Sequence, residues 1–415
     1  TLSLHDALPI LWAASLRYHE GRFYICFVAN DTRKTYLYTS EKIDGPWKKQ
    51  LIEGFYHDGS LLFDEDGRNY IVYGNDEIWI TELNEDLTAP KKDGLHRLLV
   101  SDHKNPELGY EGSHIQKING YYYIFLVHSL RDRWMRTEAC FYSDSLEGEF
   151  TGGDVLCDDR GYCGQGVAQG GIVDTPDGKW YAMLFQDSGA VGRIPILLPV
   201  TWKDHFPFFG QNGHVPEEIE VHSTRPGYIY QPLVGSDDFC NGLLPRWQFN
   251  HDPDPRYYHL DALQGTYTIT TREVCTELTQ AVNTLTQRMS YPSCAAEVTV
   301  DASALKEGDV AGLCALQGCY AAVGITKHHG KYEVLMLDKK EDGILDMTEG
   351  TVVESHQMDF RLEADFCNMK DEARCYYRVN KGDWLPIGTV HKLYFKLDHF
   401  TGCRFGLFCY AAEET

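Results

Sequence analysis

The sequence has little positive charge and no long hydrophobic run. Lys and Arg together number 38 against 61 Asp and Glu, which gives a formal net charge of −23. Proteins that bind nucleic acid or anionic membranes present clusters of Lys and Arg, so this balance argues against both kinds of partner. A transmembrane helix needs about 18 or more consecutive apolar residues, and the sequence has no such run. We therefore expect neither nucleic acid nor a membrane as a partner.

Cysteine pairs of the Cys-X-X-Cys type are also absent. Their absence argues against zinc knuckles and thioredoxin-like sites, and we expect no metal centre and no cofactor. The 13 cysteines are odd in number and irregularly spaced. Pairing of Cys157 with Cys163, or of Cys314 with Cys319, is an alternative, but an odd count favours reduced, buried thiols in an intracellular protein. The thiols favour the cytoplasm, although the location stays open because we expect the true N-terminus to lie upstream of residue 11.

The length and composition are those of a globular protein with two or more domains. The chain has 415 residues, of which 43% are hydrophobic and 24% charged. Aromatic residues make up 13%, and no long amphipathic helical pattern occurs. Aromatic side chains suit β-strands, and packing in a β core accounts for most of them. Their flat faces also suit the binding of sugar rings.

Four segments repeat one pattern: an apolar alternating strand, a tight turn closed by Gly, and an aromatic strand. They are residues 16–25, 60–71, 114–123 and 171–181. Turns such as Asn119-Gly120 between two such runs are strong hairpin signals. The turn glycines follow one another at intervals of 46 to 58 residues, a period typical of the blades of a β-propeller.

Two acidic residues, Asp58 and Glu111, stand directly before the second and third of these hairpins. Equivalent positions of propeller blades face a common central site, so we expect the two carboxylates to converge on one pocket. Paired carboxylates are the working groups of glycoside hydrolysis. The structural alternatives are an Asx-turn residue for Asp58 and an exposed loop acid for Glu111.

Composition and turn signals divide the chain into segments. Residues 11–221 are rich in strands, residues 222–235 have the pattern of a linker, and residues 236–415 carry short alternating strands typical of a β-sandwich. We therefore predict an all-β protein with a propeller followed by a sandwich, whose last strand we expect to be missing. Residues 1–10 match one reading frame of a sequencing adapter, and we exclude them as an artefact; a real N-terminal loop is the alternative.

Several motifs in order resemble glycoside hydrolase family 43. Residues 12–18 (WAASLRY) resemble the W-A-P-S-L-R-Y blade start of that family, residues 57–67 its D-P-S-L-F-F-D-D-D-G stretch, and residues 110–115 its E-G-P-H-I stretch. Residues 169–178 and 189–193 complete the set. In the first three motifs a proline of the family is replaced, by Ala14, Gly59 and Ser113.

The second block is similar to the concanavalin-like sandwich that follows the propeller in β-xylosidases of this family. The segments that carry this likeness are residues 238–239, 246–248, 283–288 and 308–313. Together, the two resemblances cover nearly all of residues 11–410.

The resemblance implies a five-bladed propeller. Four hairpin units are visible, so we expect the first blade to be missing from this chain. It also implies three acids: a general base from the first blade, an Asp that modulates the pKa of the acid and positions the sugar, and a Glu that is the general acid. Asp58 matches the second and Glu111 the third, whereas the base has no counterpart, since Asp6 lies in the excluded segment. We therefore expect open strand edges, poor solubility and essentially no turnover.

The chemistry of inversion explains why such acids are needed. One carboxyl group protonates the leaving oxygen while a second, roughly 6.5–9.5 Å away, activates a water molecule on the opposite face of the sugar. The first group has to be protonated at the working pH, and burial beside a negative charge promotes this. Asp58 would supply that charge beside Glu111.

Three further residues are expected to contact the sugar. Arg193 follows a run of small residues, and a guanidinium fork suits vicinal hydroxyls; the structural alternative is a pair with Asp187. Trp12 would stack on the sugar ring, with core packing as the alternative. Gln169 would reach the pocket from the fourth hairpin.

The sequence therefore predicts an inverting glycoside hydrolase of the β-xylosidase or α-L-arabinofuranosidase kind. The choice of pentose comes from the resemblance. Hemicellulose oligosaccharides are the expected partner, and a homo-oligomer is left open. The alternative function is a non-catalytic carbohydrate-binding propeller and sandwich protein.

Overall fold

The computed structural model describes residues 11–221, 223, 225–396 and 400–412. Regular structure in this part of the chain is β, apart from three short 3₁₀ turns at Gly189–Val191, Leu278–Gln280 and Cys367–Met369. The predicted all-β fold class is confirmed. Within the described residues, no helix is long and apolar enough to cross a membrane. The segment 1–10, predicted to be an artefact, lies outside these residues.

The chain forms two compact units. The first comprises Pro9–Asp187 and Ile194–Ser223, and the second contains Thr224–Thr415 together with Ser188–Arg193. The main boundary therefore falls at the start of the predicted linker. The short segment Ser188–Arg193, which the sequence analysis assigned to the propeller, groups with the second unit.

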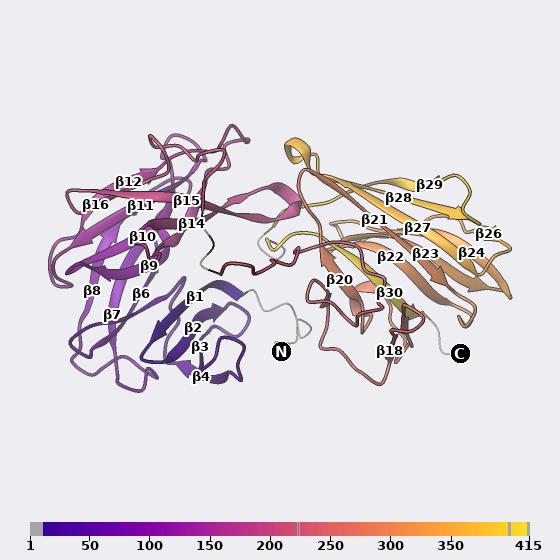
Figure 1. The fold of residues 1–415 in the computed structure, drawn as a ribbon, viewed down its shortest axis with the longest axis horizontal. Helices are drawn as coiled ribbons and strands as arrows, with labels where there is room; N and C mark the ends of the chain where they lie inside the picture. The colour runs from indigo at the N-terminus through magenta and orange to yellow at the C-terminus, as the bar shows by residue number, and fades with distance from the viewer. Residues whose placement is uncertain (1–10, 222, 224, 397–399, 413–415) are drawn as a thin grey trace. The chain divides into compact units, whose positions relative to one another are not determined.

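The first unit contains four antiparallel sheets of four strands, in which each strand pairs with the next along the chain (Figure 1). The sheets are β1 (Leu11–His19), β2 (Arg22–Ala29), β3 (Lys34–Ser40) and β4 (Lys48–Ile52); β5 (Ser60–Phe63), β6 (Asn69–Asn75), β7 (Glu77–Leu83) and β8 (His96–Ser101); β9 (Glu111–Ile118), β10 (Tyr121–Ser129), β11 (Arg136–Ser143) and β12 (Thr151–Leu156); and β13 (Ala168–Asp174), β14 (Trp180–Asp187), β15 (Arg193–Lys203) and β16 (Phe206–Phe209). Successive up-and-down sheets of this kind are the blades of a β-propeller.

The first two strands of each sheet form the hairpins expected from the sequence. In the third sheet, Asn119 and Gly120 connect β9 to β10 with φ values of 51° and 85°. Two consecutive positive φ values define a type I′ turn, whose twist matches that of the flanking strands. Asn and Gly tolerate this backbone region better than other residues, which explains why the dipeptide marks the turn.

Apolar side chains of successive sheets form shared buried cores. The pairs that represent these cores are Leu37 with Ile71, Val72 with Ile124, and Phe125 with Leu184. Each pair joins one sheet to the next, so burial of the alternating apolar faces predicted from the sequence holds the blades together.

The first strands of the four sheets, β1, β5, β9 and β13, lie side by side and are called the inner strands. Arg17 on β1 donates through Nη2 to Ser60 Oγ at 2.6 Å and to Ile115 O at 3.1 Å. Gln116 on β9 donates to Ile172 O on β13 at 2.8 Å. Residues at the beginning of each inner strand are therefore brought to one region of the propeller.

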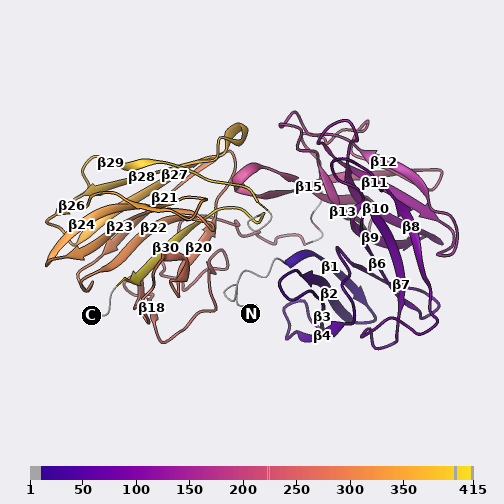
Figure 2. The same ribbon diagram turned by 180° about the vertical axis from the view of Figure 1, so that it is seen from behind.

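The second unit is a β-sandwich (Figure 2). One sheet has the order β17-β20-β30-β22-β23-β24-β25, with β26 also paired to β24, and the other has the order β21-β27-β28-β29. Its strands are β17 (Gln248–Phe249), β18 (Tyr258–Asp261), β19 (Thr266–Ile269), β20 (Leu285–Arg288), β21 (Ser293–Asp301), β22 (Asp309–Leu316), β23 (Tyr320–His328), β24 (Lys331–Lys339), β25 (Leu345–Met347), β26 (Thr351–Val353), β27 (Gln357–Asp365), β28 (Glu372–Val379), β29 (Leu385–Lys392) and β30 (Arg404–Ala411).

The core of the sandwich lies between these two sheets. Val323 and Met336 of the first sheet share one buried cluster with Phe360 and Cys375 of the second. The predicted sandwich is confirmed. All 13 cysteines are free thiols in the structure, several of them in the sandwich core.

Candidate active site

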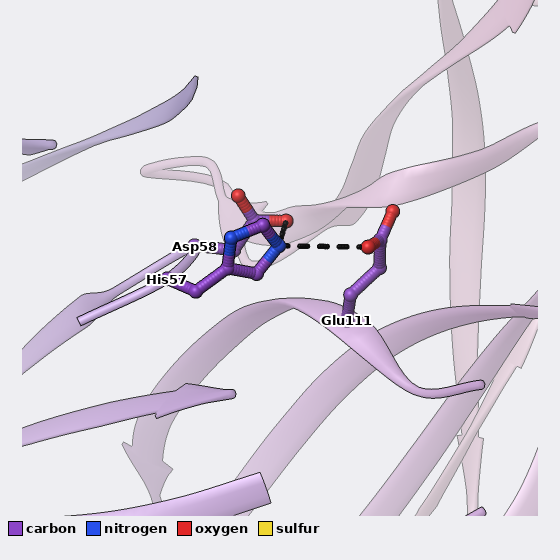
Figure 3. Close-up of side chains that lie close together, drawn as sticks. All are labelled: His57, Asp58 and Glu111. Carbon is purple, nitrogen blue, oxygen red and sulfur yellow. Dashed lines mark ion pairs between the residues drawn. The ribbon is translucent and has the colours of Figure 1, made fainter. Parts of the chain in front are cut away.

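The carboxylates of Asp58 and Glu111 meet at one imidazole. Asp58 stands two residues before β5, and Glu111 is the first residue of β9. Both side chains point toward His57 (Figure 3). His57 Nε2 lies 3.7 Å from Asp58 Oδ2 and 3.6 Å from Glu111 Oε2. The structure thus brings together the two acids that the sequence analysis selected and adds a histidine between them.

Hydrogen-bond donors hold both carboxylates in place. Gly112 N donates to Asp58 Oδ2 at 3.0 Å, which ties the residue after Glu111 to the other acid. Asn75 at the end of β6 donates through Nδ2 to Glu111 Oε2 at 2.9 Å. The buried Ser113 hydroxyl lies 2.7 Å from Asp58 O and fixes the backbone there. Donors fixed on neighbouring strands therefore pre-organise the pair.

His57 responds to the two negative charges around it. Burial alone lowers the pKa of an imidazole. Here the close contact with Glu111 and the charges of Asp58 and Glu111 outweigh burial, so the pKa of His57 is raised above its ordinary value. A protonated His57 would form ion pairs with both acids.

Trp12 is the fourth side chain of this group. Its ring meets the imidazole of His57 edge-on, with centroids 4.9 Å apart and an interplanar angle of 87°. Trp12 lies on β1, the inner strand next to the Asp58 loop. The structure therefore places this predicted sugar contact beside the acids.

The same irregularity recurs at the beginning of three inner strands. In β1, β9 and β13, two residues stand opposite one residue of the paired strand, directly after Trp12, Glu111 and Ala168. The first residue of each bulge has a positive φ, which is 29° at Ala13, 67° at Gly112 and 66° at Gln169. A bulge bends its strand and re-aims neighbouring side chains. Trp12 and Glu111 thus occupy equivalent positions on their strands.

Gln169 lies against the residue that follows Glu111. A Cβ built on Gly112 would come within 2.8 Å of Gln169 Cγ, so the glutamine fills the space beside that glycine. Gln169 Oε1 accepts from Arg136 Nη2 at 2.5 Å, and its backbone N donates to Glu138 Oε2 at 2.7 Å. A left-handed glutamine costs of the order of 1–3 kcal/mol, which these buried bonds offset.

Arg193, the third predicted sugar contact, makes its described contacts within the second unit. Its backbone N donates to Phe400 O at 3.1 Å, and its guanidinium carbon lies 4.7 Å from the centre of the Phe400 ring. Asp187, the partner that the structural alternative named for Arg193, accepts from Arg136 Nη1 at 2.8 Å. A role for Arg193 in sugar binding stays a prediction.

Comparison with known proteins decides the family. Residues 2–207 match the model of glycosyl hydrolases family 43, and residues 236–415 match that of the β-xylosidase C-terminal concanavalin A-like domain. The chain belongs to glycosyl hydrolase family 43. Its two structural units correspond to these two matches, and the family assigned from sequence motifs is confirmed.

Relatives of this family 43 chain include enzymes with named pentosidase activities. A β-xylosidase of Formosa agariphila is 24% identical over 97% of this chain and 75% of its own length. A xylosidase/arabinosidase of Humicola insolens is 26% identical over 74% of this chain and 61% of its own length. The structure of a bifunctional GH43-CE protein of Bacteroides eggerthii is 40% identical, with a TM-score of 0.84 over 98% of this chain and 52% of that one.

The chain thus spans only part of several relatives. It covers 60% and 61% of two curated proteins that it matches, and about half of the Bacteroides eggerthii chain.

The site also offers donor atoms of the kinds that bind cations. One ligand atom each of His57, Asp58 and Glu111 lies within 4.8 Å of the others, and the described residues contain no second group of this kind. Imidazole nitrogen and carboxylate oxygens are ligands that transition metals accept. The same atoms are those that acid–base chemistry needs, and both carboxylates already accept protein hydrogen bonds.

Sequence reasoning missed two residues of this family 43 site, His57 and Asn75. His57 stands inside the quoted motif, directly before Asp58, just as Glu111 stands directly before Gly112. This matching position at the entry to an inner strand could have indicated His57. Asn75 gives no such signal, because its contact with Glu111 depends on the pairing between different sheets.

Proposed function

We propose that this chain is the propeller and sandwich part of a glycoside hydrolase that releases a pentose, xylose or arabinose, from hemicellulose oligosaccharides with inversion. The observation that carries the proposal is the meeting of Glu111 and Asp58 at His57, at the beginning of neighbouring inner strands. The names of the relatives, β-xylosidase and xylosidase/arabinosidase, support the choice of sugar.

The two carboxylates take different roles because their surroundings differ. The Glu111 side chain is 19% exposed, whereas that of Asp58 is 6% exposed and accepts the backbone N–H of Gly112. The more accessible Glu111 can reach the oxygen of a glycosidic bond and give it a proton, so it is the general acid. Asp58 would supply a negative charge beside that acid and position both the acid and the sugar.

The separation of the two acids supports a general base outside this pair. One carboxylate oxygen of Asp58 and one of Glu111 lie within 4.8 Å of each other. An inverting acid and base stand roughly 6.5–9.5 Å apart, since a water molecule must fit on the far side of the sugar. The short separation supports Asp58 as the modulating residue and a base from outside the pair, as the resemblance implies.

Trp12 and Gln169 complete the proposed sugar site. The edge contact between Trp12 and His57 supports a role for the indole as one wall of the sugar subsite. Gln169, predicted to reach the pocket, lies against Gly112, the residue after Glu111, which supports a place for it beside the site. Arg193 remains a proposed sugar contact on the basis of the family motif and the fit of a guanidinium fork to vicinal hydroxyls.

Azide provides a direct test with the 415-residue chain, because it can attack the sugar in place of water without a general base. Azide attacks the anomeric carbon, the bond to the nitrophenyl oxygen breaks, and that oxygen takes a proton from Glu111 or from water to give nitrophenol. We expect little nitrophenol release from nitrophenyl β-D-xyloside or α-L-arabinofuranoside without azide. Azide should increase release at least tenfold and yield a glycosyl azide of inverted anomeric configuration.

Calorimetric titration with xylobiose separates the alternatives. Sugar binding without azide-dependent release would favour the non-catalytic carbohydrate-binding protein. Absence of both binding and release for either pentose would contradict the proposal. Fast release without azide would contradict the expectation that the base is missing.

A further inference from the structure

Four polar side chains of the propeller form a buried, hydrogen-bonded cluster. Arg136 and Glu138 lie on β11, Gln169 on β13 and Asp187 at the end of β14, and their exposed fractions are between 0% and 9%. Arg136 donates through Nη1 to Asp187 Oδ2 at 2.8 Å and through Nη2 to Gln169 Oε1 at 2.5 Å. Its guanidinium also lies over the ring of Phe185, 4.7 Å from the centre. One arginine thus joins β14 to the bulge of β13.

Arg136 fixes which way the Gln169 amide faces. A guanidinium group only donates hydrogen bonds, so the atom opposite Nη2 has to be the carbonyl oxygen Oε1. The amide nitrogen Nε2 consequently faces away from Arg136. Nε2 lies 2.9 Å from the place that a Cβ on Gly112 would take. The oriented glutamine therefore braces the backbone at Gly112.

Gly112 connects this brace to the acids. It directly follows Glu111, and its N–H binds Asp58 Oδ2 at 3.0 Å. Gly112 has φ +67° and no side chain that could anchor it. The Asp58 carboxylate binds its N–H, and the Gln169 side chain occupies the space where a Cβ would lie.

We propose that Arg136 is a positioning residue that acts through Gln169 on Gly112 and thereby holds Glu111 and Asp58 in their mutual arrangement. Arg136 touches neither acid in any described contact. The inference deepens the proposed function and rests on it only where sugar binding is concerned. The bracing of Gly112 itself is a property of the fold.

The cluster is poorly explained by stability alone. Arg136 Nε and Glu138 Oε1 have no hydrogen-bond partner among the described residues. Buried charges are costly to desolvate, and apolar side chains of similar volume often stabilise a protein as well or better. Gln169 is in addition held at φ +66°. A strained, partly satisfied polar cluster beside a site is expected where geometry matters more than stability.

Amide hydrogen exchange of the peptide around Gly112 tests the brace directly. The variants are Arg136→Met, Gln169→Ala and the double variant, with Arg136→Lys as the milder change should the first destabilise folding. Lysine keeps the charge beside Asp187 but cannot bind both partners in the guanidinium geometry. Arg97→Met is the matched control, because Arg97 on β8 bonds the carbonyls of Leu146 and Gly148 away from the site.

We expect Gly112 to exchange at least tenfold faster in Arg136→Met and in Gln169→Ala, relative to core amides of β6 in the same protein. The double variant should be no faster than the faster single variant, since both changes remove one brace. In Arg136→Lys the relative exchange rate of Gly112 should lie between those of the wild type and Arg136→Met. In Arg97→Met this relative rate should be unchanged. An unchanged ratio in Arg136→Met, or in Arg136→Lys together with Gln169→Ala, would overturn the inference.

Xylobiose titration of the same proteins links the brace to the site. Where the parent chain binds, we expect the dissociation constant to rise at least tenfold in Arg136→Met and not in Arg97→Met. Unchanged affinity in the variant would overturn the link between brace and acids. A parent chain that binds no pentoside would contradict the proposed function, while the exchange ratios would still decide the inference about Gly112.

Discussion

The imidazole of His57 faces the carboxylate of Glu111, with Nε2 and Oε2 3.6 Å apart. This contact and the nearby charge of Asp58 raise the pKa of His57 despite its burial. The proton on His57 therefore reports the charge of the acid pair. Removing one charge should change its titration in a defined direction.

Glu111→Gln should lower the pKa of His57 toward its ordinary value, because the variant loses the negative charge and keeps the shape. NMR titration of the His57 ring proton measures this. A raised folded-state pKa also means that the stability His57 confers is fully present below about pH 6.5 and is lost as the pH rises through the folded-state value. The unfolding free energy of the wild type should therefore fall relative to that of His57→Gln as the pH rises over that window. An unshifted NMR titration midpoint of His57 in Glu111→Gln would show that His57 and Glu111 do not interact.

Gly112→Ala should weaken both the fold and the site. The new methyl group would sit 2.8 Å from Gln169 Cγ, on a backbone at φ +67°. Backbone strain and overpacking together should cost roughly 2–4 kcal/mol of unfolding free energy. Urea unfolding and xylobiose titration measure the two effects.

Gly120→Ala is the matched control for that variant. Gly120 has φ +85° in the β9–β10 turn, but a Cβ there meets nothing within 4 Å. It should cost only the backbone strain, about 1–2 kcal/mol, and leave sugar affinity unchanged. Equal losses of affinity in both variants would mean that Gly112 has no special role.

Glu138→Gln should change how stability depends on pH. Burial raises the pKa of Glu138 well above its ordinary value, and the bond from Gln169 and the charge of Arg136 lower it by less. The folded state then binds more protons at this group than the unfolded state, so the free energy of unfolding falls as pH rises. Glutamine keeps an oxygen for the Gln169 N–H and removes that slope.

Urea unfolding of both proteins between about pH 5 and about pH 8 measures this difference. The wild type should lose stability relative to Glu138→Gln as the pH increases. Parallel curves would mean that Glu138 titrates alike in the folded and unfolded states.

Local sequence signals were sufficient for the parts of the fold that local chemistry determines. Asn119-Gly120 marks a hairpin because both residues accept positive φ, and the alternating strands around it follow from burial on one face. Asp58 and Glu111 were identified from motifs that directly precede these hairpins. Because each motif lies within a few residues of its turn, the sequence alone indicates where the acids lie in the fold.

The arrangement around the acids depends on contacts that no local signal encodes. The bond between Asn75 and Glu111 spans two sheets, and the Arg136–Gln169 bond joins β11 to β13. A shift of one residue in strand register turns a side chain to the other face, so the bulges decide which groups meet. The surroundings of Arg193 could not be predicted for the same reason, because its contact with Phe400 joins segments that are far apart in the sequence.

The leaving-group dependence of Glu111→Gln tests the central claim, that Glu111 is the general acid, most directly. The measurement compares azide-supported cleavage of a phenyl pentoside, whose leaving group needs a proton, with that of a nitrophenyl pentoside, whose leaving group barely does. General acid catalysis contributes roughly 10²–10⁴-fold. We predict a loss of about 100-fold or more for the phenyl substrate and a much smaller loss for the nitrophenyl substrate. Equal losses for both substrates, or none, would contradict the account.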